Sequence, residues 1–228
     1  IKHLELKEQI DLHYVKAKGQ GGDYYFENIK INNLDDGYSI LTKGELNRIS
    51  VDKLLYEFDD FEQTYINSNQ IKGEISSAFK ASFFINPSKS FDLKSLTFNS
   101  DNSFQHIKLV DYNYIAEIVD YFDESMITRN IVDIPYYKQK SKKIIFKPFR
   151  NNMSFKDGKL NISPTYLENN MLNLNLKGTQ TISDSVDYYM SFNWKEIKKR
   201  NKKEKEDYLE EKEEIKELFL RITGHIVT

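Results

Sequence analysis

The sequence predicts a mostly β protein: an antiparallel meander curled into a groove or open barrel with an apolar inner face. Two observations lead to this prediction. Apolar and polar residues alternate with a period of two in many short segments, from one end of the chain to the other. Tyr and Phe supply 15 residues each, whereas Gly and Pro supply 9 and 4, and bulky rings favour the half-buried surface of a strand.

The clearest predicted strand covers residues 71–85, where every second residue from Ile71 to Ile85 is apolar or small. Such a strand buries one face and exposes the other to water. The same alternation predicts further strands at Leu4/Leu6, Ile10/Leu12/Tyr14, Tyr24/Phe26, Ile29/Ile31, Leu54/Tyr56/Phe58, Leu160/Ile162, Leu172/Leu174/Leu176, residues 186–194 and residues 218–226.

Turn-forming residues separate these segments. They occur at residues 19–23, 33–37, 86–87, 99–103, 156–158 and 183–184. Short turns of this kind join neighbouring antiparallel strands, which favours a meander. Because each strand is apolar on one side only, the apolar sides must face one another, a helix or a ligand.

One predicted helix interrupts the strands. From Asp111 to about Glu124 the apolar residues fall at helical spacing, with Asp111 as the predicted N-cap. A predicted loop rich in Tyr, Lys and Gln follows to about Lys143. We therefore expect residues 111–143 to be a helix-plus-loop insertion that covers or caps the sheet.

Residues 195–217 form a second exception, because Lys dominates the first half of this segment and Glu the second half. A segment that buries so little apolar surface cannot offset the entropy lost on ordering. We predict a charged linker between the last two strands, so that residues 1–194 and 218–228 form one β-groove domain. The chain begins at Ile1, within a strand-like alternation, and we expect it to be a piece of a longer protein.

The composition argues against several classes of function. The net charge of −2, from 33 basic and 35 acidic residues, argues against a nucleic-acid partner. The sequence has no Cys, and its four His are scattered, so we predict no metal site. No apolar run approaches the roughly 20 residues of a membrane-spanning helix.

Enzyme signatures are missing as well. The sequence lacks the serine-hydrolase, zinc-protease, Walker A and dinucleotide-binding motifs. The glycine-rich residues 19–22 are predicted to be a turn. In Asp35/Asp36 and Asp59/Asp60 the two carboxylates are adjacent, so on a strand they would point to opposite faces. We predict no catalytic residue and no cofactor.

Two membrane-related interpretations also fit parts of the sequence. Tyr136 and Tyr137, followed by Lys138, Lys140, Lys142 and Lys143, are an arrangement able to touch a membrane surface. A loop kept soluble by lysines is the simpler interpretation, because few charges cluster there. Alternating aromatic strands are also typical of outer-membrane barrels, but the irregular turn lengths and the lack of paired aromatic girdles argue against one.

Specific motifs appear from residue 144 onward. Residues 153–164 read MSFKDGKLNISP, residues 172–179 read LNLNLKGT, residues 185–188 read SVDY, and residues 218–224 read LFLRITG. In this order, and with a charged linker before the last motif, they resemble the C-terminal region of AsmA-like envelope proteins. The resemblance covers residues 144–228. Upstream it rests on residues 71–75, IKGEI, which are similar to the family's Gly-containing strands.

The resemblance implies a protein anchored in the inner membrane by a helix outside this chain, with its body in the periplasm. There the family's strands curl into a groove that carries phospholipid acyl chains towards the outer membrane, alongside other envelope proteins. The long charged linker departs from the family pattern. So does the predicted helix at 111–124, which would close the groove and make this fragment a terminal cap.

A lipid groove needs no catalytic residue, because burying acyl chains gains about 0.8 kcal/mol per methylene. The predicted groove residues lie on two strands: Ile71, Ile75, Phe79, Phe83, Ile85, Leu172, Leu174 and Leu176. Two other hypotheses remain. The first is a structural or interaction β domain of an envelope complex, with a closed core and no lipid. The second is a carbohydrate-active β-sandwich enzyme.

Overall fold

A computed structural model describes residues 9–57, 59–62, 66–86, 88, 91–126, 128–130, 132–182, 185–197 and 217–225. The predicted fold class is confirmed: the strands form one 11-stranded antiparallel sheet that does not close. Several predictions lie outside the described residues, namely those for Leu4/Leu6, Phe58, Pro87, residues 183–184, the charged segment from 198 to 216, and Ile226.

The strands are arranged as a meander, in the order β1-β2-β3-β4-β5-β7-β8-β9-β10-β11, and β6 also pairs with β5. Their bounds are β1 Gln9–Gly19, β2 Gly22–Leu34, β3 Gly37–Ser50, β4 Ile71–Ile85, β5 Phe91–Val110, β6 Lys143–Ile145, β7 Phe149–Lys156, β8 Lys159–Leu167, β9 Leu174–Thr181, β10 Ser185–Asn193 and β11 Glu217–His225. The last two strands pair along their whole length, from Ser185 opposite His225 to Asn193 opposite Glu217.

The tight turns predicted at residues 19–23, 33–37 and 156–158 join neighbouring strands. Between β7 and β8, Asp157 and Gly158 have φ angles of 52° and 71°, as a two-residue hairpin turn of type I′ requires. Between β1 and β2, Gln20 and Gly21 also have positive φ angles, 47° and 83°. The glycine-rich residues 19–22 therefore form a hairpin turn.

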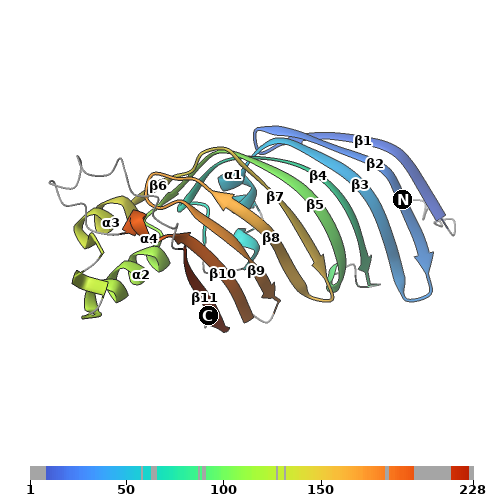
Figure 1. Ribbon diagram of the computed structural model, residues 1–228. Helices are drawn as coiled ribbons and strands as arrows, with labels where there is room; N and C mark the ends of the chain where they lie inside the picture. The colour runs from blue at the N-terminus through green and yellow to red at the C-terminus, as the bar shows by residue number, and fades with distance from the viewer. Residues whose placement is uncertain are drawn as a thin grey trace.

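Bulges bend the long strands. In β2 the register shifts between Glu27 and Lys30, where Asn28 has a φ of 52°. This bulge places Tyr24/Phe26 and Ile29/Ile31 in one strand, whereas the sequence predicted two. Further shifts occur in the pairing of β3 with β4 and of β4 with β5. Bulges increase twist and bend a strand, and the sheet is visibly curled (Figure 1).

The predicted turn at residues 99–103 is wrong, because these residues lie in the middle of β5. Asn and Ser favour turns, but here β5 is paired on both sides, with β4 and with β7. The two neighbours satisfy the backbone hydrogen bonds, so that tertiary pairing overrides local propensity.

The predicted strand at Leu54/Tyr56 is also wrong, because residues 51–57 form the helix α1 (Val51–Glu57), followed by the 3-10 helix η1 (Asp59–Glu62). Leu, Lys and Glu favour a helix. Leu55, which the alternation omitted, is the buried residue of α1, and Tyr56 is 76% exposed.

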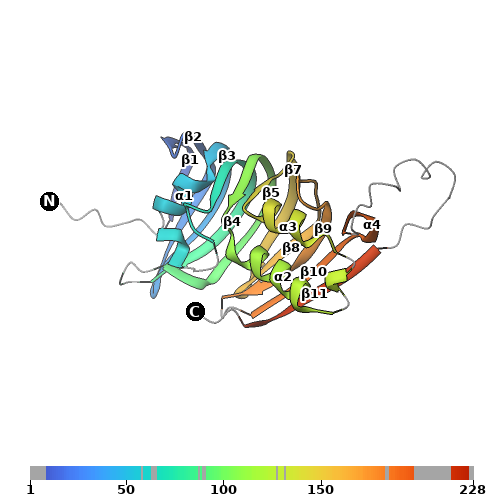
Figure 2. The ribbon, with the colours of Figure 1, turned by 90° about the vertical axis from the view of Figure 1, so that its left-hand side faces the viewer.

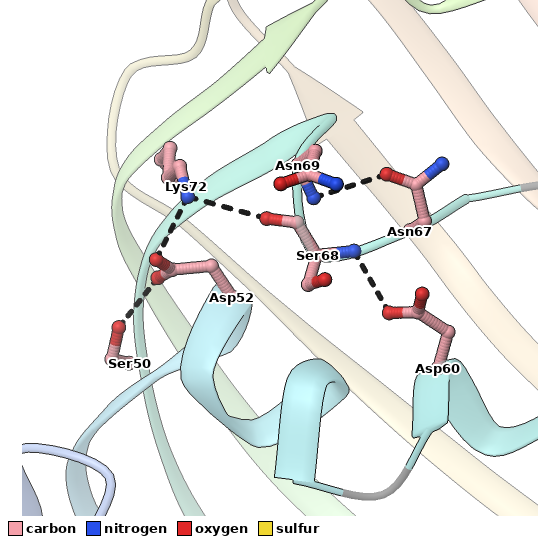
Figure 3. A network of polar contacts seen from close by, with 7 residues as sticks. All are labelled: Ser50, Asp52, Asp60, Asn67, Ser68, Asn69 and Lys72. Carbon is pink, nitrogen blue, oxygen red and sulfur yellow. Dashed lines mark hydrogen bonds and ion pairs between the residues drawn. The ribbon is translucent and has the colours of Figure 1, made fainter.

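A polar network ties α1 and η1 to the start of β4 (Figure 3). Asp52 accepts hydrogen bonds from Ser50 Oγ and from Lys72 Nζ, the latter at 3.0 Å. Lys72 Nζ also donates to the Ser68 carbonyl, and Asp60 accepts from the Ser68 backbone N–H at 2.8 Å. Burial alone would raise the pKa of Asp52, but the hydrogen bonds from Ser50 and Lys72 outweigh it and lower that pKa.

The predicted helix near 111–124 is confirmed as α2 (Asn113–Glu124), but its N-cap position is Tyr112, which makes no capping hydrogen bond through its side chain. Asp111 has a φ of 47° and lies one residue too early to cap the helix. The predicted loop to Lys143 contains the 3-10 helix η2 (Thr128–Asn130) and the helix α3 (Ile134–Ser141). The loop prediction missed α3, which Asp133 caps by accepting from the Tyr136 N–H.

Helices α2 and α3 pack against the end of the sheet formed by β9, β10 and β11. Five buried residues form the apolar core at this contact, which we call the helix cluster: Val119, Val132, Ile134, Tyr137 and Phe192. Tyr137 Oη also donates to the carbonyl of Glu196 in α4 (Trp194–Ile197), so that Trp194 begins a helical turn instead of ending a strand. Figure 2 shows α1, α2 and α3 on the same side of the sheet.

Candidate functional site

Strand β4 carries five of the predicted groove residues. Ile75, Phe79 and Phe83 alternate along it, and each is partly buried. Phe79 lies opposite Gly44 of β3 and Ser100 of β5. Ile85 continues the alternation, and Ile71 lies beyond the bulge at Gly73, opposite Leu109. The structure therefore brings Ile75, Phe79, Phe83 and Ile85 onto one face of the sheet.

The three predicted leucines have different surroundings. Leu172 precedes β9, whose first residue is Leu174. Both side chains pack against the helix cluster and so contribute to the core. Leu176 lies farther along β9, opposite Met190 of β10 and Thr165 of β8.

The strand register shows that Phe79 and the helix cluster lie on the same face of the sheet. In β10, Phe192 of the cluster and Tyr188 are four residues apart, so both point to one side. Tyr188 belongs to a row of directly opposed residues that crosses the sheet: Phe26, Gly44, Phe79, Ser100, Met153, Ile162, Gly178, Tyr188 and Ile222. We call this the helix-side face.

Aromatic rings are packed closely on the helix-side face. Phe98 of β5 stacks on Phe155 of β7, with ring centroids 6.0 Å apart and planes 3° apart. Six residues farther along β5, Phe104 stacks on Phe149 of β7 with a centroid separation of 4.7 Å. The ring of Phe79 lies over Gly44, where an added Cβ would be 2.5 Å from the ring.

Between the stacked pairs lies a polar position that the sequence had assigned to a turn. Asn102 of β5 is directly opposite Asn151 of β7, and their side chains are only 6% and 8% exposed. Asn102 Nδ2 donates to Asn151 Oδ1 at 3.2 Å and to Ser100 Oγ at 3.0 Å. We call these two residues the amide pair. The sequence offered one signal for it, the polar residues at 99–103 between apolar flanks.

The opposite face of the sheet is polar and hollowed. A cavity of about 720 Å³ crosses it from β2 to β8. Most of its lining residues are polar: Glu27, Lys43, Glu45, Lys80, Asn99, Asp101, Asn152, Ser154, Asn161 and Ser163, with Tyr14 and Tyr25 at one end. Gly44, Ala78, Phe79, Ser100 and Met153 also border it. Asn152 Nδ2 donates to Asp101 Oδ1. Lysine and acidic side chains both occur in this lining, so the cavity carries charges of both signs.

Ion pairs occupy the exposed surface elsewhere on this face. Arg221 binds Asp187 with two hydrogen bonds, of 2.8 and 3.1 Å, and lies over the ring of Tyr189. The hydrogen bond from Arg221 lowers the pKa of Asp187. Arg48 lowers the pKa of Glu74 in the same way. Because the partners are exposed, such pairs contribute little to stability.

The carboxylate pairs singled out in the sequence lie in connections. Asp35 and Asp36 form the turn between β2 and β3, and Asp59 and Asp60 begin η1. Within the described ranges, no three His, Asp or Glu side chains are close enough together to hold a metal ion. The same part of the chain contains no helix of the length and apolar character needed to cross a bilayer.

Comparisons of the chain with protein-family models, with curated proteins and with solved structures find no match.

Proposed function

We propose that the helix-side face is an apolar groove that holds phospholipid acyl chains, and that the chain is a non-enzymatic lipid-handling domain. The observation that supports this best is the incomplete second layer on that face. In the described part of the chain, helices α1, α2 and α3 lie over it (Figure 2). Phe79, Phe83 and Met153 are nevertheless only partly buried.

Apolar side chains that stay in contact with water cost free energy. At about 25 cal/mol per Å², covering several aromatic rings with hydrocarbon stabilises the folded protein by several kcal/mol. Monomeric proteins rarely leave large contiguous apolar patches uncovered, and such patches often bind a ligand or a partner. Acyl chains fit the row because its members are uncharged and vary in size, from Gly44 to Phe79.

The length of the row on the helix-side face also suits an acyl chain. Neighbouring strands are about 4.8 Å apart, so the row from β2 to β8 extends roughly 24 Å across five strand spacings. The hydrocarbon core of a bilayer is about 30 Å thick and consists of two layers of acyl chains, so each chain spans about 15 Å. One chain lying across the strands therefore fits within the row.

The resemblance to AsmA-like proteins suggests the biological setting of this proposal. In that setting the chain would be the periplasmic part of an inner-membrane-anchored protein that takes part in phospholipid transport and outer-membrane homeostasis. Its partners would be phospholipids and other envelope proteins. The anchor would lie in a segment outside this chain.

Native mass spectrometry of the purified chain tests the proposal. We expect a series of masses above that of the protein, each equal to one phospholipid, which disappears after extraction with organic solvent. A protein that carries no lipid and takes up none from phospholipid vesicles would instead support an interaction domain with a closed core. Hydrolysis of oligosaccharides by a lipid-free protein would support the carbohydrate-active alternative.

A further inference from the structure

A short polar row interrupts the apolar residues of the helix-side face. Ser77 of β4, Asn102 of β5 and Asn151 of β7 are directly opposed in neighbouring strands. Their side chains are 7%, 6% and 8% exposed. Buried polar side chains reduce stability unless they are hydrogen-bonded, so a row of three on an apolar surface calls for an explanation.

The amide pair leaves hydrogen-bonding capacity unused. An Asn side chain offers two N–H donors and one oxygen acceptor. Among the described residues, Asn102 Oδ1 accepts no hydrogen bond and Asn151 Nδ2 donates none. Neither atom is enclosed, because Asp23 Oδ1 is the one fully enclosed side-chain atom without a hydrogen bond in the described chain. If both side-chain amides were rotated by 180°, Asn102 Nδ2 and Asn151 Oδ1 would be the unused atoms, so one donor and one acceptor would still be unused.

The surroundings of the amide pair suit an amphipathic ligand. The stacked rings Phe104 and Phe149 lie next to it along β5 and β7, and Ser100 with Met153 lies on the other side. Phe98 and Phe155 follow. Two apolar ring pairs thus flank one site that has a free donor and a free acceptor.

The charge of this site argues for a neutral partner. None of the residues directly opposed in the rows through Phe79, Ser77 and Ile75 is charged on β3, β4, β5 or β7. A phosphate group would need Lys or Arg beside it, and in these rows the described side chains offer amides and hydroxyls instead.

We propose that the amide pair binds the ester-linked glycerol region of an acyl lipid, with the acyl chains on the flanking phenylalanines. Asn151 Nδ2 donates to the ester carbonyl. In a diacylglycerol, Asn102 Oδ1 also accepts from the free glycerol hydroxyl, a group that a diacyl phospholipid lacks because its third glycerol oxygen carries the phosphate. This inference rests on the proposed function, because it places the polar part of the ligand on a face whose apolar part binds acyl chains. It further predicts that the phosphate lies away from the amide pair, towards solvent.

The test compares two probes with the full chain, presented in the same non-ionic detergent micelles: dioleoylglycerol and its dioleyl ether analogue. The ether lacks the carbonyl oxygens but keeps the chains and the hydroxyl. We expect the wild-type protein to bind the ester about five- to tenfold more tightly, the factor that one hydrogen bond provides. In the double variant Asn102→Leu/Asn151→Leu this ratio should fall to about one, because both partners are replaced by apolar groups.

Asn152→Leu is the matched control, since Asn152 is the next residue of β7 and lines the cavity on the opposite face. It should keep the wild-type ratio. The side-chain amide NMR signals of Asn151 in the wild-type protein provide a readout that needs no substitution, and they should shift with the ester and not with the ether. Equal binding of both probes by the wild type, with no such shift, would overturn this inference and leave the proposed function standing. Binding of neither probe would overturn both.

Discussion

Replacing Val119 with Asp is expected to detach α2 and α3 from the sheet and to lower the free energy of unfolding by about 3–5 kcal/mol. Val119 is 2% exposed and packs in the helix cluster with Val132 and Phe192. A carboxylate there has no described cation among its neighbours in the cluster. Urea denaturation followed by circular dichroism measures the loss.

The matched control is Tyr121→Asp, because Tyr121 lies on the same helix and is 69% exposed. This substitution adds the same charge without burying it, so we expect a change below about 1 kcal/mol. If the two variants unfold at the same urea concentration, the helices are not held by the cluster, and the description of this end of the sheet is wrong.

Replacing Phe79 with Asp is expected to leave the protein folded while removing most of its bound lipid. The ring of Phe79 is partly buried, lies over Gly44 and meets the ring of Phe26 edge-on, with centroids 6.1 Å apart. On an open face the new carboxylate can stay hydrated, so the cost to stability should be about 1–2 kcal/mol, within the range of ordinary substitutions. Its hydration shell should exclude an acyl chain, and native mass spectrometry should show at least a tenfold lower lipid occupancy.

Lys80→Asp is the control for this variant, since Lys80 is the next residue of β4 and lines the cavity on the opposite face. Its lipid occupancy should equal that of the wild type. A Phe79→Asp protein that fails to fold would mean that Phe79 belongs to a closed core. A folded variant that keeps its lipid would mean that the acyl chains bind elsewhere.

The sheet could be predicted because its signals are local. In β4 the alternation of apolar and polar residues runs over the whole strand, and the turn at Asp157 and Gly158 has the residues that its positive φ angles require. In a hairpin, the type and length of the turn fix which residues of the two strands lie opposite each other. Local alternation and turn residues therefore predicted part of the meander, but not β3 or β5, for which the alternation indicated no strand.

The incorrect predictions concern segments whose structure is decided by distant parts of the chain. Residues 99–103 have the composition of a turn, but β4 and β7 hold them in the middle of β5. Residues 54–56 alternate like a strand, but the residue that packs is Leu55, in a helix. The α3 helix was missed because its apolar residues do not form a clear helical stripe and its partners, such as Phe192, are distant in sequence.

The candidate site was predictable only in part, for the same reason. The alternation identified Phe79 and its neighbours on β4. It could not distinguish Leu176, within the sheet, from Leu172 and Leu174, which pack against helices. The amide pair needs the register of β5 against β7, which joins residues 49 positions apart, and no local pattern specifies such a contact.

Residue-resolved photo-crosslinking tests the central claim most directly. The full chain is loaded with a phospholipid that carries a diazirine in one acyl chain, illuminated and digested, and the modified residues are identified by mass spectrometry. The proposal predicts adducts with a period of two on β4 and β7, at residues such as Phe79, Ala81 and Met153. Adducts on Lys80 and Asn152, which line the opposite face, or a distribution without this alternation, would contradict an acyl-chain groove on the helix-side face.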